Sequence, residues 1–587
     1  MASVAHASSK PARRWVKWVW IALALVVVAA VAAFAWDAFQ LKDSSAELKV
    51  HAAEAQQAVK TRDAEALTGA VSELQASAGA FANATDGPHW WVANHLPWIK
   101  NQTVPLSEAG KAVRAIADDA LAPLASMGNL EALQAPAIVD GRIDPHVLEP
   151  YRETLAQAAA VTTAQQEALD AVDLSGTVEQ VRTPFVELRT DLATLGGTIQ
   201  GGHVAAEVLP TMLGAEGERT YLVMVQNNAE PRATGGIPGA VLQVTVTDGR
   251  ISFDRYVSAS SLADAVLIPG PLTDDEERIF TERMLRYPQD INFTPELPRS
   301  AILMEQYWHR EFGEAVDGII SIDPVALGYM LQGMPATDIG GITITAENLS
   351  SVMLNQAYLA FPDPDDSDAF FALASQQLFG QLISGSTSSI AGVEQAIDEG
   401  RFMAWSANAD EQSLLATTPV AGGFLERTDT IGLFLNDGSG SKIGYYIDAS
   451  TQVVDHVCTD GTVRGETITV TYTHTFEGDV EGLPEYVAGG WLEPVGEFHA
   501  NVLLYPATGF GVTAVTFDGE AGTLQGELHD GRLMSTARIV LRPGQTLVVQ
   551  YQLEATEHGL LAPKVVVTPG ARQHPIERVI DDVESGC

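Results

Sequence analysis

An apolar segment close to the N-terminus constrains this chain more than any other feature. It runs from Trp18 to Trp36 as WVWIALALVVVAAVAAFAW and contains no charged residue. As a helix, it is long enough to cross a hydrocarbon core of about 30 Å, and it has tryptophan near both ends, where membrane interfaces favour this residue. We therefore expect a transmembrane helix over residues 18–36.

Basic residues before this segment predict its orientation. They are Lys10, Arg13, Arg14 and Lys17. The positive-inside tendency then makes residues 1–17 cytoplasmic and the bulk of the chain extracytoplasmic. The alternative is a cleaved signal peptide, because Ala33-Phe34-Ala35 has the small-x-small form of a cleavage site. The apolar stretch exceeds the usual signal-peptide core of about 7–15 residues, which favours the membrane anchor.

The charge of the chain bears on its partners. It has 75 acidic residues and 34 lysines and arginines, for a formal net charge of -41. A field of this sign repels a phosphate backbone, so nucleic acid is excluded as an expected partner. With 587 residues, the chain is also too long for one hydrophobic core and is expected to form several domains.

The region after the apolar segment has a helical pattern. Apolar residues recur at alternating steps of three and four, which places them on one helix face: Leu48, Ala52, Ala55 and Val59, then Leu67, Val71, Leu74, Ala78 and Phe81. Further helices are expected over residues 106–127, 145–172 and 177–195. The tryptophans of PHWWVANHLPWIKN, residues 88–101, either cap a bundle or lie at the bilayer surface, and burial is the commoner use of this side chain. We predict a helical stalk over residues 37–203.

Two further domains are expected from changes in the pattern. Short apolar runs at residues 221–225, 240–246, 251–257 and 318–322 are typical of strands, and helices are expected among them at residues 299–312, 324–332 and 368–383. This interleaving predicts an α/β core domain over residues 204–450. Closely spaced strand-like runs then predict a β-sandwich over residues 451–587. The predicted fold class is therefore α+β and multidomain.

Common catalytic and metal-binding motifs are absent from the sequence. It contains no His-Glu-x-x-His, Gly-x-Ser-x-Gly or Cys-x-x-Cys. NDGSGSK at residues 436–442 lacks the ending of a phosphate-binding loop and favours a turn. Four acids, Asp363, Asp365, Asp366 and Asp368, are either calcium ligands or a solvated loop, and the loop lacks the glycine and late glutamate of a calcium site. We predict no cofactor and no metal.

The two cysteines of the chain, Cys458 and Cys587, fit an exported protein that does not depend on a disulfide framework. They are either bridged, which would hold the C-terminal tail to the start of the sandwich, or free.

A polar stretch directly after the strand-like run YLVMV is the candidate binding site. QNNAEPRATGGIPGA, residues 226–240, contains glycine and asparagine, which tolerate the positive φ of a sharply bent loop, and an arginine suited to carboxylate or phosphate. Ligands of α/β sheets usually bind where strands end. The alternative is that Glu230 pairs with Arg232 or a neighbour and the stretch is structural. The predicted site comprises Gln226, Asn227, Asn228, Glu230, Arg232, Thr234, Gly235 and Gly236, with Asp290, Asn292 and Lys442 as neighbours.

Five motifs in fixed order resemble a family of exported bacterial proteins, the domain of unknown function 4012. They are QNNAEPRATGGIPGA, DINFTPELP at residues 290–298, VDGIISIDPVAL at 316–327, GRFMAWSANADEQ at 400–412 and LNDGSGSKIGYY at 435–446. The resemblance implies a membrane-anchored protein and no particular activity. The prolines of this stretch, Pro231 and Pro238, depart from the expected pattern and imply a stiffer loop.

The layout also resembles the LytR-CpsA-Psr enzymes, which transfer glycopolymers from a polyprenyl-pyrophosphate carrier to the cell wall. By that likeness, Arg232 would face a pyrophosphate. Those enzymes use several arginines, whereas the corresponding helix here, residues 368–383, has none. We therefore expect a binding or scaffolding module of the cell envelope, with glycopolymer or envelope proteins as partners, and glycopolymer phosphotransfer as the alternative; whether the protein is an enzyme stays open.

Overall fold

The computed structural model describes residues 12–61, 63–127, 138–139, 141–174, 176–264, 266–384, 390–458, 462–557 and 560–581. The chain divides into two compact units. One comprises Met1–Glu131 and Glu153–Gln200, and the other comprises Ala132–Arg152 and Gly201–Cys587. The first is helical and the second contains several sheets, so the mixed α and β, multidomain architecture agrees with the prediction.

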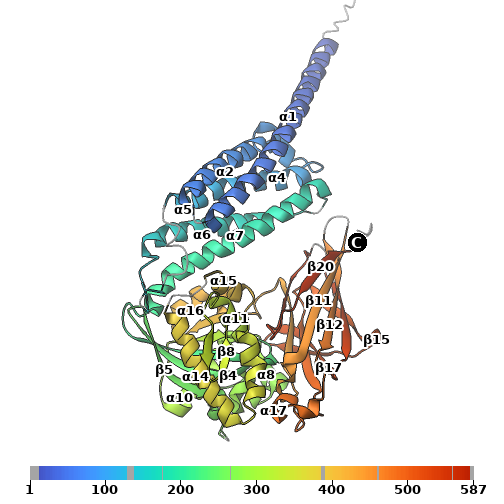
Figure 1. Cartoon of the computed structure of the whole chain (residues 1–587). Helices are drawn as coiled ribbons and strands as arrows, with labels where there is room; N and C mark the ends of the chain where they lie inside the picture. The colour runs from blue at the N-terminus through green and yellow to red at the C-terminus, as the bar shows by residue number, and fades with distance from the viewer. Residues whose placement is uncertain are drawn as a thin grey trace, which may run out of the picture. The chain divides into compact units, whose positions relative to one another are not determined.

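The helical unit is built from long helices that lie side by side (Figure 1). Its elements are α1 (Ala12–Thr61), α2 (Ala64–Ala84), α3 (Pro88–Asn94), α4 (Lys100–Ala115), the π-helix η1 (Ile116–Leu121), α5 (Ala122–Ser126), α6 (Arg152–Asp170) and the first part of α7 (Glu179–Met212). The predicted apolar face of α2 is buried, with Leu67 and Val71 packed against Ala55 and Ala58 of α1. Asp63 begins α2 by accepting a hydrogen bond from the backbone of Ala66, as an N-cap should.

The predicted membrane span lies on α1. Side chains at residues 12–29 and 31 lie outside the described set, so the span at residues 18–36 stays a prediction. In the part of the chain that the structure does describe, none of the helices combines the length and apolar composition needed to cross a membrane.

The predicted aromatic corner divides its tryptophans between two environments. Trp90 is buried and donates a hydrogen bond from Nε1 to Asp37 at 3.0 Å, whereas Trp91 and Trp98 are exposed. One tryptophan therefore packs into the bundle, and the other two do not.

A mixed seven-stranded sheet forms the centre of the second unit. Its order is β1-β2-β5-β4-β3-β6-β9, in which β3 and β6 are parallel and the other neighbours are antiparallel. The strands are β1 (Ile138–Val139), β2 (Arg142–Ile143), β3 (Arg219–Arg232), β4 (Gly235–Thr247), β5 (Arg250–Ser258), β6 (Gly318–Ile322) and β9 (Phe402–Ser406). The predicted strands correspond to β3, β4, β5 and β6, while β9 was not predicted.

Helices cover both faces of this sheet. Alternate residues of β3 point to opposite sides, and apolar side chains on each side pack against helices. Leu222 and Met224 pack on one face with Met304 and Trp308 of α10 (Leu297–Phe312). Val223 lies on the opposite face, where the described residues of α7, α11 (Pro324–Met330), α14 (Pro364–Ile383) and α15 (Ile390–Asp398) pack.

Shorter elements complete this part of the unit. They are η4 (Ala259–Leu262), α8 (Asp274–Phe280), α9 (Arg283–Arg286), η5 (Pro288–Phe293), β7 (Thr337–Ile339), β8 (Ile342–Ile344), α12 (Leu349–Ser351), η6 (Val352–Gln356), α13 (Ala357–Ala360), α16 (Ala409–Leu415), η7 (Pro419–Ala421) and η8 (Lys442–Tyr446). Asp363, one of the four acids considered for calcium, accepts a hydrogen bond from the backbone of Asp365 and caps α14.

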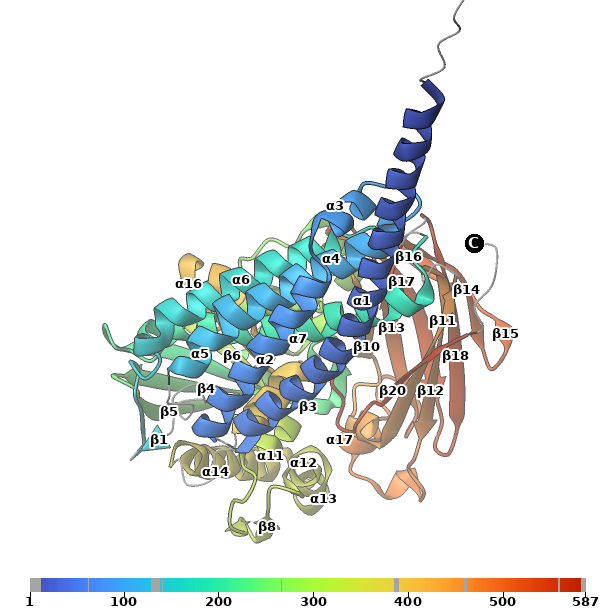
Figure 2. The same cartoon turned by 90° about the horizontal axis from the view of Figure 1, so that it is seen from above.

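The β-sandwich has sheets of five and six strands, in the orders β16-β17-β13-β10-β19 and β15-β14-β18-β12-β11-β20. Strands of the larger sheet lie side by side in Figure 2. The strands are β10 (Thr430–Asp437), β11 (Ile447–Val457), β12 (Val463–His474), β13 (Phe498–Tyr505), β14 (Phe510–Phe517), β15 (Glu520–Ala521), β16 (Gln525–His529), β17 (Arg532–Leu541), β18 (Thr546–Ala555), β19 (Lys564–Val567) and β20 (Ile576–Ile580). The inner faces meet through alternating residues such as Ile468 and Val470.

Strand β10 joins the two cores of the unit. Ile431 and Leu433 pack in the sandwich, whereas Phe434 packs with the core of the mixed sheet. The sandwich therefore includes a strand that precedes residue 451, where the sequence pattern placed its start. A strand buried on both faces is nearly continuously apolar, so TIGLFLND lacks the alternation that identifies a strand with one solvated face.

Candidate functional site

The polar stretch is a bulged β-hairpin rather than the curled loop that we predicted. Strand β3 continues through Arg232, and Ala233 and Thr234 form the turn into β4. Asn227 pairs with Ile237 and Pro231 with Gly236, so residues 228–230 have no partners on β4 and bulge out of the ladder. A bulge redirects side chains without ending the strand, which explains how this bent polar segment stays within a sheet.

Both glycines of the hairpin are required by its geometry. Gly235 has a φ of +134°, a region that L side chains rarely adopt. A Cβ on Gly236 would lie 2.2 Å from the backbone oxygen of Asn227. The pair lets the returning strand approach the bulge closely.

The three amides of the hairpin are buried and engaged with the protein. Gln226 donates to Ser321 and accepts from the backbone of Gly236. Asn227 donates to the Tyr358 hydroxyl at 2.7 Å. Asn228 donates to Asp323 at 3.0 Å and to a backbone oxygen at residue 569. These contacts fix the hairpin against β6 and the helices beyond it.

Arg232 is buried and paired with Asp290, not with Glu230. Its guanidinium lies 3.2 Å from a carboxylate oxygen of Asp290, donates to the backbone oxygen of Asp437, and lies over the ring of Phe293. Asp290 is also bound by Arg283 at 2.7 Å. Among the described residues, Nε of Arg232 has no partner, whereas both of its NH2 groups donate to protein oxygens.

Glu230 pairs instead with Lys442. The Nζ of Lys442 lies 2.6 Å from Glu230 and faces the rings of Tyr358 and Tyr486. Burial by itself lowers the pKa of Lys442, but Glu230 and the tyrosines raise it above its ordinary value. NDGSGSK therefore ends in a lysine that is committed to an ion pair, in agreement with a turn rather than a phosphate-binding loop.

Asp437 is the unusual acid beside this network. Its Oδ1 accepts the backbone N–H of Ser439 at 2.7 Å, whereas its Oδ2 has no partner among the described residues. Burial raises the pKa of Asp437 to about 7, although Arg232 acts in the opposite direction. Asn292, fully buried nearby, donates to the backbone of Gly236.

A second buried arginine pair was missed by the sequence reasoning. Arg401 lies 2.8 Å from Asp323 and also binds Glu399. Asp323 in turn caps α11 through the backbone of Ala326. Burial lowers the pKa of Arg401, but the two acids raise it above the ordinary value. The position of Arg401 in GRFMAWSANADEQ, directly before the strand FMAWS, was the available signal.

A cavity of about 420 Å³ lies beside the hairpin turn within the second unit. Its lining comes from the hairpin turn, the segment before α10, β9 and the segment before it, β10 and the segment before it, and β19 with the residues after it. The lining residues include Ala233, Thr234, Pro295, Asp398, Glu399, Arg401, Met403, Phe424, Arg427, Phe434, Val566, Gln573 and His574. Its volume falls within the range of about 300–1,000 Å³ that is usual for small-molecule sites. Among the predicted site residues, only Thr234 lines this cavity.

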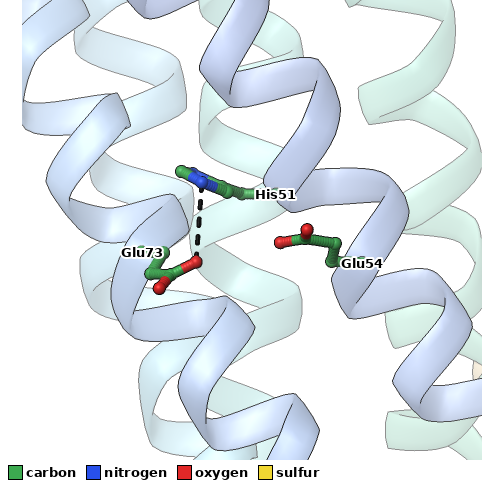
Figure 3. Close-up of side chains that lie close together, drawn as sticks. All are labelled: His51, Glu54 and Glu73. Carbon is green, nitrogen blue, oxygen red and sulfur yellow. Dashed lines mark ion pairs between the residues drawn. The ribbon is translucent and has the colours of Figure 1, made fainter.

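Two groups of side chains in the described part of the chain have the composition to hold a metal ion. In one, His51 and Glu54 of α1 lie beside Glu73 of α2 (Figure 3). His51 is 3.5 Å from Glu73 and contacts Ser77, so an ion pair and a hydrogen bond account for its position. The other group is Glu276, His529 and Asp530, in which Arg299 already occupies both oxygens of Glu276. Neither arrangement by itself requires a metal.

The two cysteines, for which a bridge and free thiols were both considered, lie only partly within the described residues. Cys458 is disulfide-bonded, and Cys587 lies outside the described set.

Comparison with known proteins supports the predicted family resemblance. Residues 216–358 match the model of a family described as a protein of unknown function, DUF4012. The match contains the hairpin together with Asp290 and Asn292, while Lys442, Arg401 and Arg427 lie beyond it. No curated protein and no solved structure matches the chain. The likeness to LytR-CpsA-Psr enzymes stays a prediction.

Proposed function

We propose that this protein is a membrane-anchored, extracytoplasmic binding or scaffolding module of the cell envelope, with the cavity beside the hairpin turn as its ligand site. The anchor is the apolar segment over residues 18–36, and its basic flank favours export of the rest of the chain. The match to DUF4012 is compatible with this role and brings no activity of its own.

The contrast between the hairpin and the cavity carries the proposal. The NH2 groups of the hairpin amides and of the Arg232 guanidinium bind protein groups, although Asn228 Oδ1 and Arg232 Nε have no partner among the described residues. The adjoining cavity has room for a small molecule and combines aromatic side chains such as Phe424 with polar groups such as Thr234. A mostly apolar concave site with a few polar groups is the usual form of a ligand pocket.

Glycopolymer phosphotransfer receives less support. That chemistry needs cations that face the phosphates of a lipid carrier, and Arg232 is the residue that the likeness assigns to this task. Arg232 is 7% exposed and bound to Asp290. Binding of a pyrophosphate there would require this pair to break.

Protease digestion tests the membrane topology. A protease added to intact protoplasts is expected to digest both units and to leave a stub that contains residues 18–36. Full protection of the sandwich would reject the extracytoplasmic location.

Co-sedimentation with purified, insoluble cell-wall material tests the binding role of the full-length protein in detergent. Gln573 lines the cavity and is exposed, so Gln573→Trp should fill the cavity mouth without disturbing the core. The matched control is Gln525→Trp, at an exposed position of β16. We expect wild type and Q525W to sediment with the wall and Q573W to remain in the supernatant. Sedimentation of all three, or of none, would contradict the proposed site.

A further inference from the structure

The segment between η7 and β10, residues 422–429, is held in place by two charged side chains from other elements. Glu296, at the start of α10, accepts the backbone N–H groups of Phe424 and Leu425. Arg532, on β17, donates to the backbone oxygens of Phe424, Leu425 and Arg427 and lies 4.3 Å from the centre of the Phe424 ring. A segment tied at both its N–H and its carbonyl groups is positioned before any ligand arrives.

This segment carries Arg427, which has no partner among the residues that the structure describes. Within the described residues, the Arg427 guanidinium makes no hydrogen bond and no ion pair, although it is only partly exposed and lines the cavity. Burial lowers the pKa of Arg427, while Glu296 and Asp429 act at longer range to raise it. A partly desolvated guanidinium without an acceptor is unfavourable in the free protein, and its planar fork suits a carboxylate or a phosphate.

The other titratable residues of the lining are paired with each other, exposed to solvent or neutral. Arg401 and Glu399 bind each other at 2.7 Å. Burial lowers the pKa of His574 to about 4, which leaves it neutral at physiological pH. Asp398 is exposed. Arg427 is therefore the lining cation that is available to a ligand.

Thr234 supplies a second group without a partner. Thr234 lines the cavity and is 6% exposed, and its Oγ1 forms no hydrogen bond with any residue that the structure describes. Buried polar atoms in native proteins are nearly always satisfied, so an unsatisfied hydroxyl on a cavity wall indicates a missing partner. Phe424, Phe434 and Met403 provide apolar surface in the same lining.

From these observations we infer that the cavity binds a small molecule that carries a carboxylate or phosphate group, with Arg427 as the anion ligand and Thr234 as a hydrogen-bonding group for the same molecule. The inference rests on the proposed function in one respect, namely that the cavity is the ligand site. A sugar acid and a sugar or polyol phosphate share the required chemistry.

Calorimetric titration with two matched pairs of probes tests the inference on the full-length protein in detergent. The pairs are glucuronate with glucose, and glycerol 3-phosphate with glycerol. We expect at least one acid to bind and its neutral counterpart to bind far more weakly. Arg427→Gln should weaken binding of that acid about 10- to 100-fold, the usual loss for a hydrogen bond to a charged group. Arg427→Lys should restore part of it, and Arg538→Gln, at an exposed arginine on β17, should leave it unchanged.

The probe results separate this inference from the proposed function. Equal binding of an acid and its neutral counterpart, or binding that survives R427Q, would overturn the anion site and leave cavity binding intact. Binding of none of the four probes at millimolar concentration would also overturn it. Wall co-sedimentation that depends on the cavity would then still support the proposed function. Preference for glucuronate or for glycerol 3-phosphate identifies which anion the site accepts.

Discussion

Arg232 and Arg427 belong to the same compact unit and differ in what surrounds their guanidinium groups. Arg232 meets Asp290 and a backbone oxygen, whereas Arg427 meets no acceptor in the described part of the chain and lines a cavity. The sequence pointed to Arg232 because it stands in a glycine-rich, polar motif. An arginine in such a motif can therefore be structural, whereas a guanidinium that has no acceptor among the described residues points to a ligand site.

The largest effect on stability is expected at Arg401, the other buried arginine that is paired with acids. Arg401→Gln leaves Asp323 buried without its cation, so the free energy of unfolding should fall by about 3–5 kcal/mol. Chemical denaturation followed by tryptophan fluorescence measures the change, with Arg538→Gln as the exposed control. A loss of unfolding free energy below about 1 kcal/mol would show that the ion pairs of Arg401 contribute little to stability.

Asp437 gives a second test of the buried network around Arg232, because one of its carboxylate oxygens has no partner among the described residues. Its folded pKa of about 7 lies above the unfolded value of about 3.9. The folded state therefore binds the proton more tightly, and ionisation destabilises it as pH rises from about 4 to about 7. The stability of Asp437→Asn relative to wild type should increase across this range by up to about 1.4 kcal/mol per pH unit and then level off.

Denaturation of both proteins at pH 5, 6, 7 and 8 gives this difference and cancels contributions from other titrating groups. A difference that does not change with pH, or that falls as pH rises, would contradict the burial of an acid with a raised pKa at this position.

The smallest change in stability is expected at Thr234, which lines the cavity together with Arg427. Thr234→Val removes a hydroxyl that has no partner in the described part of the chain and keeps the shape of the side chain. The free energy of unfolding should stay within about 0.5 kcal/mol of wild type or increase. A loss of about 2 kcal/mol or more in the same denaturation experiment would show that the hydroxyl is satisfied within the protein.

Local patterns in the sequence were sufficient for much of the fold. An apolar run bounded by turn residues predicted β6 at Gly318–Ile322, and helical periodicity predicted the buried face of α2. These elements are identified by periods of two and 3.6 residues, which depend on neighbours along the chain. Strand β10 was not predicted, because it is buried on both faces and its sequence does not alternate between apolar and polar residues.

The site was less accessible to sequence reasoning because its contacts are distant in the chain. Arg232 and Asp290 are 58 positions apart, and Glu230 and Lys442 are 212 apart. All four residues were part of the predicted site, but the sequence did not predict which of them pair. Arg427 stands in LERTDT, which has no motif, and its interest arises from the lack of an acceptor, which local sequence does not encode.

Parallel denaturation of Arg232→Gln and Arg427→Gln tests most directly whether the first arginine is structural and the second is free for a ligand. We expect R232Q to lose about 3 kcal/mol or more of unfolding free energy, since Asp290 loses a buried partner. For R427Q we expect a value within about 0.5 kcal/mol of wild type, since the Arg427 guanidinium makes no hydrogen bond and no ion pair in the described part of the chain. Equal losses in the two variants, or a larger loss in R427Q, would contradict these roles of the two arginines.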